Sequence, residues 1–89
     1  MRTVISVIGK DGVGIIAKIS AILSTHKINV LDITQSVLDD MFVMVMLADI
    51  SKSLVDFPAL VSELDALGNE LGLKIHTMHE DVFNSMHRI

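Results

Sequence analysis

The chain contains no cysteine, no tryptophan and no tyrosine, and it has a single proline among 89 residues. Without cysteine it has no disulfide framework, no thiolate nucleophile and no zinc knuckle, which fits a reducing compartment. Three Phe are present, and with no Trp or Tyr beside them the chain offers few aromatic rings on which RNA bases could stack. These absences argue against a disulfide-rich secreted protein and against an RNA-recognition module.

Basic charge is also scarce. Seven Lys and Arg residues stand against eleven Asp and Glu, for a formal net charge of -4, and the basic residues form no tract. A nucleic-acid-binding surface normally needs clustered Lys and Arg, so we expect no nucleic-acid partner. No apolar stretch approaches the roughly 20 residues of a membrane span or has the flanks of a signal peptide. We therefore expect a cytoplasmic protein with no membrane partner.

The apolar content is high. Hydrophobic residues make up 51% of the chain, and 89 residues are enough for one compact core and no appended domain. We expect a single domain over residues 1–89. A chain this short buries only about 60 to 65% of its unfolded surface, so an apolar segment without a partner indicates oligomerisation.

Changes of hydrophobic period in the first half of the chain indicate a strand, a helix and two more strands. The segment TVISVIG is short and rich in β-branched residues, which favours a strand that ends at Gly9. From Val13 to about His26, isoleucine and leucine recur with the spacing of a helix that lies on a sheet. Two apolar segments follow, INVLDITQSVL and MFVMVMLADI. Asp39 and Asp40 between them predict the turn of an antiparallel hairpin.

The second half predicts a helix, a strand and a short terminal helix. Pro58 suits a first helical turn, leucines then mark one face, and Gly72 can end the helix. LKIHTM predicts a fourth strand, and EDVFNSMHRI a short helix near residues 80–87. The resulting order is that of an α+β, ferredoxin-like βαββαβ sandwich, with a four-stranded antiparallel sheet, two helices on one face and a short C-terminal helix.

The third predicted strand is apolar on both of its faces. Met44 and Met46 project to one side, and Val43 and Val45 project to the other. Two helices cover only one face of a sheet, so the second face must meet another subunit or the terminal segment. We expect a homodimer, formed either by edge pairing or face to face.

A glycine-rich turn, GKDGVG at residues 9–14, separates the first strand from the first helix. Free backbone N–H groups and the helix dipole favour an anion there, such as a carboxylate or a phosphate. The glycine spacing matches neither a Walker loop nor a dinucleotide-binding fingerprint. The structural alternative is that Asp11 caps the helix, while Gly14 and Ala17 on one helix face allow a close approach to the sheet.

The resemblance to a known family rests on two patterns. They are Asp11-x-x-Gly14-x-x-Ala17 after the first strand, and Asn29-Val30-x-Asp32-Ile33 at the opening of the second. With them the whole chain resembles an ACT domain, a small regulatory module attached to many enzymes of amino-acid metabolism, and in particular the stand-alone, ACT-only proteins of the UPF0237 family. In ACT domains, amino-acid ligands typically lie between the first strand–helix turn of one subunit and the beginning of the second strand of its partner.

Carried over to this chain, the resemblance implies two ligand-binding segments. They are Asp11, Gly12, Val13 and Gly14 on one side, and Asn29, Val30, Leu31 and Asp32 on the other. Helix N-terminal amides would hold the carboxylate of an amino acid, and Asp32 or the Asn29 side-chain oxygen would accept from its ammonium group. The charge of Asp11 would repel a ligand carboxylate, so Asp11 either faces the ammonium or excludes anions. The alternative for Asn29 and Asp32 is ordinary turn and edge-strand chemistry.

Metal-binding and catalytic chemistry find little support. Four residues have suitable ligand types: His76, His79, Glu80 and His87. In a continuing strand His76 and His79 point to opposite faces, which favours surface or half-buried histidines over a metal site. No nucleophile stands at a recognisable spacing from a base and an orienting acid. As candidate nucleophiles we considered Ser20, Ser24 and Ser36, which are explained more simply as solvent-facing or packing residues.

The sequence therefore predicts a regulatory ligand-binding domain that is not an enzyme and needs no cofactor. The expected ligand is an amino acid or a related metabolite, and the expected partners are a second copy of the chain and a regulated protein. The alternative is a structural or protein–protein interaction module that uses the same fold without a small-molecule ligand.

Overall fold

The order of elements agrees with the sequence prediction. The computed structural model describes residues 1–10 and 14–86. Its elements are β1 (Arg2–Gly9), α1 (Ile15–Thr25), β2 (Asn29–Leu38), β3 (Met41–Asp49), α2 (Phe57–Leu71), β4 (Lys74–His79) and α3 (Glu80–Met86).

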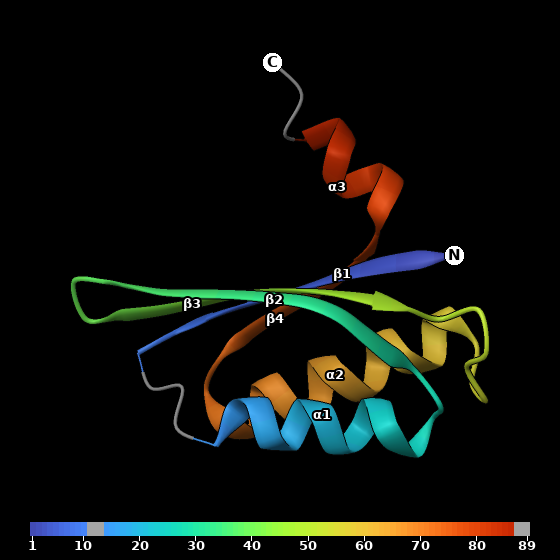
Figure 1. Cartoon of the computed structure of the whole chain (residues 1–89). Helices are drawn as coiled ribbons and strands as arrows, with labels where there is room; N and C mark the ends of the chain where they lie inside the picture. Colours follow the sequence, from blue (N-terminus) through green and yellow to red (C-terminus); the bar gives the residue numbers. More distant parts are fainter. Residues whose placement is uncertain (11–13, 87–89) are drawn as a thin grey trace.

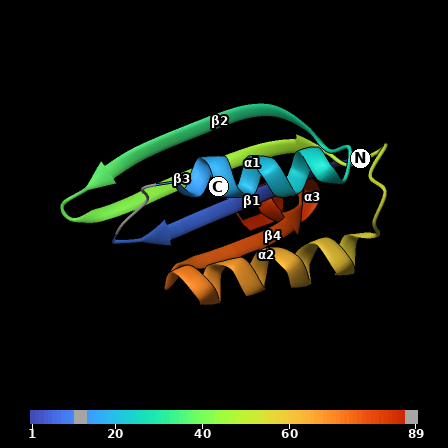
Figure 2. The same ribbon diagram turned by 90° about the horizontal axis from the view of Figure 1, so that it is seen from below.

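The strands form one antiparallel sheet in the order β2-β3-β1-β4, with β2 and β4 at its edges. In the middle of the sheet, Ile5 of β1 pairs with Met46 of β3 and with Thr77 of β4. Helices α1 and α2 lie on one face, and α3 lies on the other side (Figures 1 and 2). The ferredoxin-like βαββαβ arrangement is thus confirmed.

Local signals explain where the elements begin and end. Asp56 is the N-cap of α2, and its carboxylate accepts a hydrogen bond from the Ala59 N–H at 3.0 Å. Pro58 lies in the first turn, and Gly72 ends the helix with a φ of 71°. In the β2–β3 hairpin Asp39 has a φ of 57°, a conformation that Asp tolerates better than most residues. The predicted positions of Pro58 and Gly72 in this helix and the predicted hairpin turn are confirmed.

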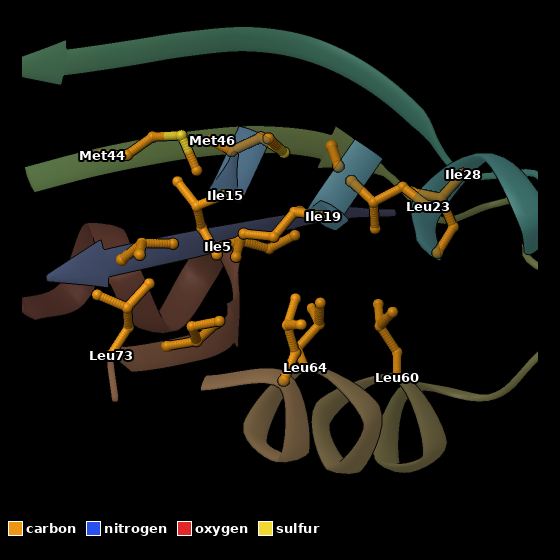
Figure 3. Close-up of a cluster of buried hydrophobic side chains, with 14 residues drawn as sticks. Ile5, Ile15, Ile19, Leu23, Ile28, Met44, Met46, Leu60, Leu64 and Leu73 are labelled. Carbon is orange, nitrogen blue, oxygen red and sulfur yellow. The ribbon is translucent and has the colours of Figure 1, made fainter. Parts of the chain in front are cut away.

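The hydrophobic core lies between the sheet and the two helices (Figure 3). Met44 and Met46 of β3 are fully buried there, as is Ile5 of β1. The helices contribute Ile15, Ile19, Leu23, Leu60, Leu64 and Leu67, and further buried members are Val7, Ile28, Ala48, Leu73 and Ile75. Alternation along β3 therefore places Met44 and Met46 in the core and Val43 and Val45 on the opposite side, as the sequence predicts.

Two glycines at the start of the chain have different roles. A Cβ added to Gly9 would lie 2.0 Å from Leu73 Cδ2, so Gly9 allows β1 to pass close to the loop before β4. A Cβ added to Gly14 would meet nothing within 4 Å, and both Gly14 and Ala17 are exposed. The expected close approach of the helix to the sheet through Gly14 and Ala17 is therefore wrong. Gly14 has a φ of 76°, so its backbone conformation is what favours glycine there.

The side of the sheet away from α1 and α2 is called the outer face below. Among the described residues no helix packs flat against it. The outer face consists of Val4, Ser6 and Ile8 from β1, Asp32, Thr34 and Ser36 from β2, Val43, Val45 and Leu47 from β3, and Lys74, His76 and Met78 from β4. From the end of β4, α3 rises away from this face (Figure 1). No helix among the described residues is long and apolar enough to cross a membrane.

Candidate functional site

The first candidate segment is the turn between β1 and α1. Gly14 is the N-cap of α1 and makes no side-chain capping bond, while its carbonyl accepts from the Lys18 N–H at 3.1 Å. No acidic side chain lies in the first turn of the helix. The amides at this end thus have no side-chain acceptor from the helix itself, which leaves them suited to an anionic group. The predicted site residues Asp11, Gly12 and Val13 lie outside the described residues.

The second candidate segment is the beginning of β2. Asn29 and Val30 open the strand, and Leu31 forms a bulge between the pairs Val30–Ala48 and Asp32–Leu47. The Asp32 carboxylate accepts from the N–H of Ile33 at 2.9 Å, and Asp32 belongs to the outer face, away from α1. Every residue of β2 except Val30 is exposed, because β2 is an edge strand and lies beyond the cover of α1 (Figure 2).

Within one chain the two segments are far apart. Gly14 precedes the first residue of α1, and Asn29 follows the turn after its last residue, so the whole helix separates them. The 11 residues of α1 span roughly 16 Å at 1.5 Å per residue. One chain therefore does not bring the two predicted halves of the site together.

A hollow of about 590 Å³ lies at the C-terminal end of α1. Its lining consists of Ser20, Leu23, Ser24, Lys27, Ile28, Asn29, Val30 and Lys52. Of the predicted site residues, only Asn29 and Val30 contribute to it. The sequence analysis did not identify Lys27 and Lys52. Hydrophobic period and local motifs do not indicate that the end of a helix lies beside a loop more than twenty residues further along the chain.

Lys27 holds an unusual backbone position beside this hollow. Its φ is 61°, in the left-handed region that favours glycine, and its N–H donates to the Ser24 carbonyl at 3.2 Å. The next residue, Ile28, donates to the Leu23 carbonyl at 2.9 Å, which completes the end of α1. A lysine at this end also interacts favourably with the negative end of the helix dipole.

Asp49 supplies a negative charge close by. Together with Lys27, Asn29, Ser51 and Lys52 it lines a smaller hollow of about 220 Å³. The Ser51 N–H donates to the Asp49 carboxylate at 2.9 Å, and hydrogen bonds from Ser51 hold the pKa of Asp49 below its ordinary value. The start of β2 is thus a polar region that carries both charge signs.

The histidines that the structure describes do not gather into a metal site. His76 belongs to the outer face, whereas His79 stacks on Phe57 with ring centroids 4.1 Å apart. Among residues 1–10 and 14–86 there is no group of three His, Asp or Glu side chains that could hold a metal ion. His87 lies outside the described residues. The opposite orientation of His76 and His79 agrees with the sequence prediction.

Comparisons with known proteins identify the family. The family model of the ACT domain matches residues 2–78. A UPF0237 protein of Methanocaldococcus jannaschii is 50% identical over 88 residues, which are 99% of this chain and 98% of the relative. Another, from Clostridium acetobutylicum, is 49% identical over 89 residues and all of both chains. The chain therefore belongs to the ACT domain family, a family of regulatory ligand-binding domains, and within it to the UPF0237 proteins.

Solved structures agree with this assignment. An ACT domain protein from Streptococcus pneumoniae has a TM-score of 0.80 and 36% identity, with 93% of each chain covered. A formyltetrahydrofolate deformylase from Burkholderia mallei has a TM-score of 0.76 but only 15% identity, and the match covers 88% of this chain and 28% of that one. The second likeness concerns the fold alone.

Proposed function

We propose that the chain is a sensor domain that binds a small amino acid or a related metabolite at the junction of a homodimer. The ligand would lie between the turn before α1 in one copy and the beginning of β2 in the other. Binding would change the assembly or its contacts with a regulated protein. The family is regulatory and binds ligands; the proposal adds that the ligand is a small amino acid or related metabolite and that it binds at the dimer junction.

The observation that carries the proposal is the free edge of β2. Among the described residues this strand pairs only with β3, on one side. It begins near the C-terminal end of α1 and runs toward the end where Gly14 lies. If two copies pair their β2 edges antiparallel, the Asn29 end of one strand lies beside the Leu38 end of the other. Each Gly14 turn then lies near the partner's Asn29, so a dimer joins the halves that one chain separates.

The chemistry of the two halves suits a zwitterion. The amides at the start of α1 donate to a carboxylate, and Asn29, which is exposed and lines the hollow beside α1, offers an amide oxygen to an ammonium group. Asp32 was the other predicted acceptor, but it belongs to the outer face and already accepts from Ile33. We therefore assign the ammonium contact to Asn29.

The test is a thermal melt with a panel of amino acids and related metabolites. A ligand at 100 times its dissociation constant adds about 2.7 kcal/mol to the native state. At roughly 4 to 8 °C per kcal/mol for a domain of this size, that shift is easy to see. Calorimetry or an extrinsic dye follows the melt, because the chain has no Trp or Tyr to report by intrinsic fluorescence. We expect at least one member of the panel to raise the melting temperature.

Three variants locate the site. Asn29→Ala should abolish the shift in melting temperature, and Asp32→Ala should retain it. Asp65→Ala removes an exposed carboxylate from α2 and is the matched control for Asp32→Ala. Loss of the shift in Asp32→Ala alone would overturn the assignment to Asn29. A flat response over the whole panel would reject the sensor function and favour an interaction module without a small-molecule ligand.

A further inference from the structure

The hollow of about 590 Å³ at the C-terminal end of α1 is lined by two lysines. Lys27 comes from the end of the helix and Lys52 from the loop after β3, and every other residue of the lining is neutral. Both lysines are exposed, and no ion pair among residues 1–10 and 14–86 includes either of them. Within the described part of the chain, the lining therefore carries two positive charges and no negative one.

The backbone holds Lys27 beside this hollow. Hydrogen bonds from Lys27 to the Ser24 carbonyl and from Ile28 to the Leu23 carbonyl form a Schellman motif, in which the residue with positive φ is usually glycine. A β-carbon disfavours the φ of 61° that Lys27 adopts. Strained backbone of this kind is typical of functional sites. The position therefore favours a role for the lysine side chain, because the turn alone would be better served by glycine.

The carbonyl groups at this end of α1 are largely occupied by hydrogen bonds. Free carbonyls at a helix C-terminus repel an anion. Here the Thr25 hydroxyl and the backbone N–H groups of the following residues donate to them. The accepting carbonyls are those of Ala21, Ile22, Leu23, Ser24 and His26. The negative end of the helix is thus shielded, and the two lysines determine the charge of the hollow.

Asp49 is the nearby negative charge, and it is engaged elsewhere. It lines only the smaller adjoining hollow, where its carboxylate accepts from the Ser51 N–H and lies 3.8 Å from the terminal amino group of Met1. Hydrogen bonds from Ser51, together with smaller contributions from the charges of that amino group and of Lys52, hold the pKa of Asp49 below its ordinary value. Asp49 therefore does not neutralise the lysines in the larger hollow.

We propose that Lys27 and Lys52 hold a second negative group of the ligand, so that the ligand is an amino acid whose side chain ends in a carboxylate or a phosphate. The inference rests on the proposed function and specifies its ligand class. Asn29, the proposed ammonium contact, also lines the hollow, so a ligand held there has the lysines beside its side chain. Ser20 and Ser24, one turn apart on α1, add hydroxyl donors for further oxygen atoms.

The test compares ligands that differ in the charge of the side group. Melting temperatures are measured over a range of concentrations of aspartate and asparagine, glutamate and glutamine, and phosphoserine and serine. We expect at least one acidic compound to have a dissociation constant about tenfold lower than its neutral counterpart, because hydrogen bonds to an ionised group are stronger than neutral ones. The first two pairs report on a carboxylate, and the third reports on a phosphate.

The possible failures are distinguishable. Equal dissociation constants within every pair, or shifts in melting temperature from neutral compounds alone, would overturn the inference and leave the proposed function standing. No shift from any amino acid or metabolite would reject both.

Four variants locate the second negative group. Lys27→Gln and Lys52→Gln each remove a charge from the hollow, and we expect either change to abolish the preference for the acidic compound while the neutral counterpart binds as before. Lys74→Gln removes an exposed charge from β4, outside the hollow, and should keep the preference. Lys27→Gly separates the side chain from the backbone, because glycine suits the φ of 61°.

The glycine variant should therefore have a higher melting temperature than the parent without ligand, and yet lose the preference for the acidic compound. A preference that survives in Lys27→Gly and in Lys52→Gln, or that is lost equally in Lys74→Gln, would overturn the assignment of the lysines.

Discussion

The imidazole Nε2 of His26 lies 2.6 Å from the carboxylate Oε2 of Glu63, and this pair joins the end of α1 to α2. The His26 side chain is 16% exposed and the Glu63 side chain 43% exposed. The His26 N–H donates to the carbonyls of Ile22 and Leu23, so the backbone holds the imidazole in place. The contact holds the C-terminal end of α1 against the middle of α2 on one face of the sheet.

Glu63→Ala should lower the free energy of unfolding by about 1 kcal/mol, because the pair is partly shielded from water yet open on the glutamate side. Glu70→Ala removes an exposed carboxylate from the same helix and should change stability by less than about 0.5 kcal/mol. Urea unfolding of both variants measures the difference. Equal effects would mean that the pair contributes nothing specific.

Gly14→Ala should cost about 1 to 2 kcal/mol, because an L residue at a φ of 76° is strained. Gly14→Leu should cost a similar amount, since a Cβ at this position meets nothing within 4 Å. Gly14→Asn should be milder, because Asn adopts the left-handed region more readily than most residues. Melting temperatures of the three variants test this order, and a much larger loss for Leu than for Ala would show that space matters there after all.

Gly9→Ala should destabilise the fold by about 1 to 3 kcal/mol, since its new methyl group would overlap Leu73 Cδ2 at 2.0 Å. Leu73→Ala by itself should also be destabilising, by about 2 to 5 kcal/mol, because Leu73 is a buried core residue. In the double variant the overlap disappears, so the two losses should not add. Simple additivity in denaturant unfolding would contradict this close contact.

The lowered pKa of Asp49 predicts that the free energy of unfolding depends on pH in the acid range. Hydrogen bonds from Ser51, the backbone one foremost, lower the pKa of Asp49 in the folded state. The stabilisation is present above the ordinary pKa of a free Asp, near pH 3.9, and is lost as the pH falls through the lower folded-state pKa. Asp49→Asn should therefore show a shallower loss of stability than the parent as the pH falls below about 4. Parallel curves for the two proteins would count against the assigned cause.

The sequence determined those features that depend on neighbours along the chain. The change of period at Gly9, Pro58 in a first helical turn, the helix end at Gly72 and the turn at Asp39 each act within a few residues. Alternation in β3 was equally local, and it correctly placed Met44 and Met46 in the core. These signals were sufficient for the element order and hence for the fold class.

The tertiary structure decided which distant segments meet. The sheet order makes β2 an edge strand, which is the feature that the proposed ligand-binding dimer uses. The pairing of His26 with Glu63, the contact of Gly9 with Leu73 and the position of α3 beside an open sheet face likewise join residues far apart in sequence. Local propensity and period contain no information about such pairs, because their energies arise only when the packed layers bring the side chains into contact.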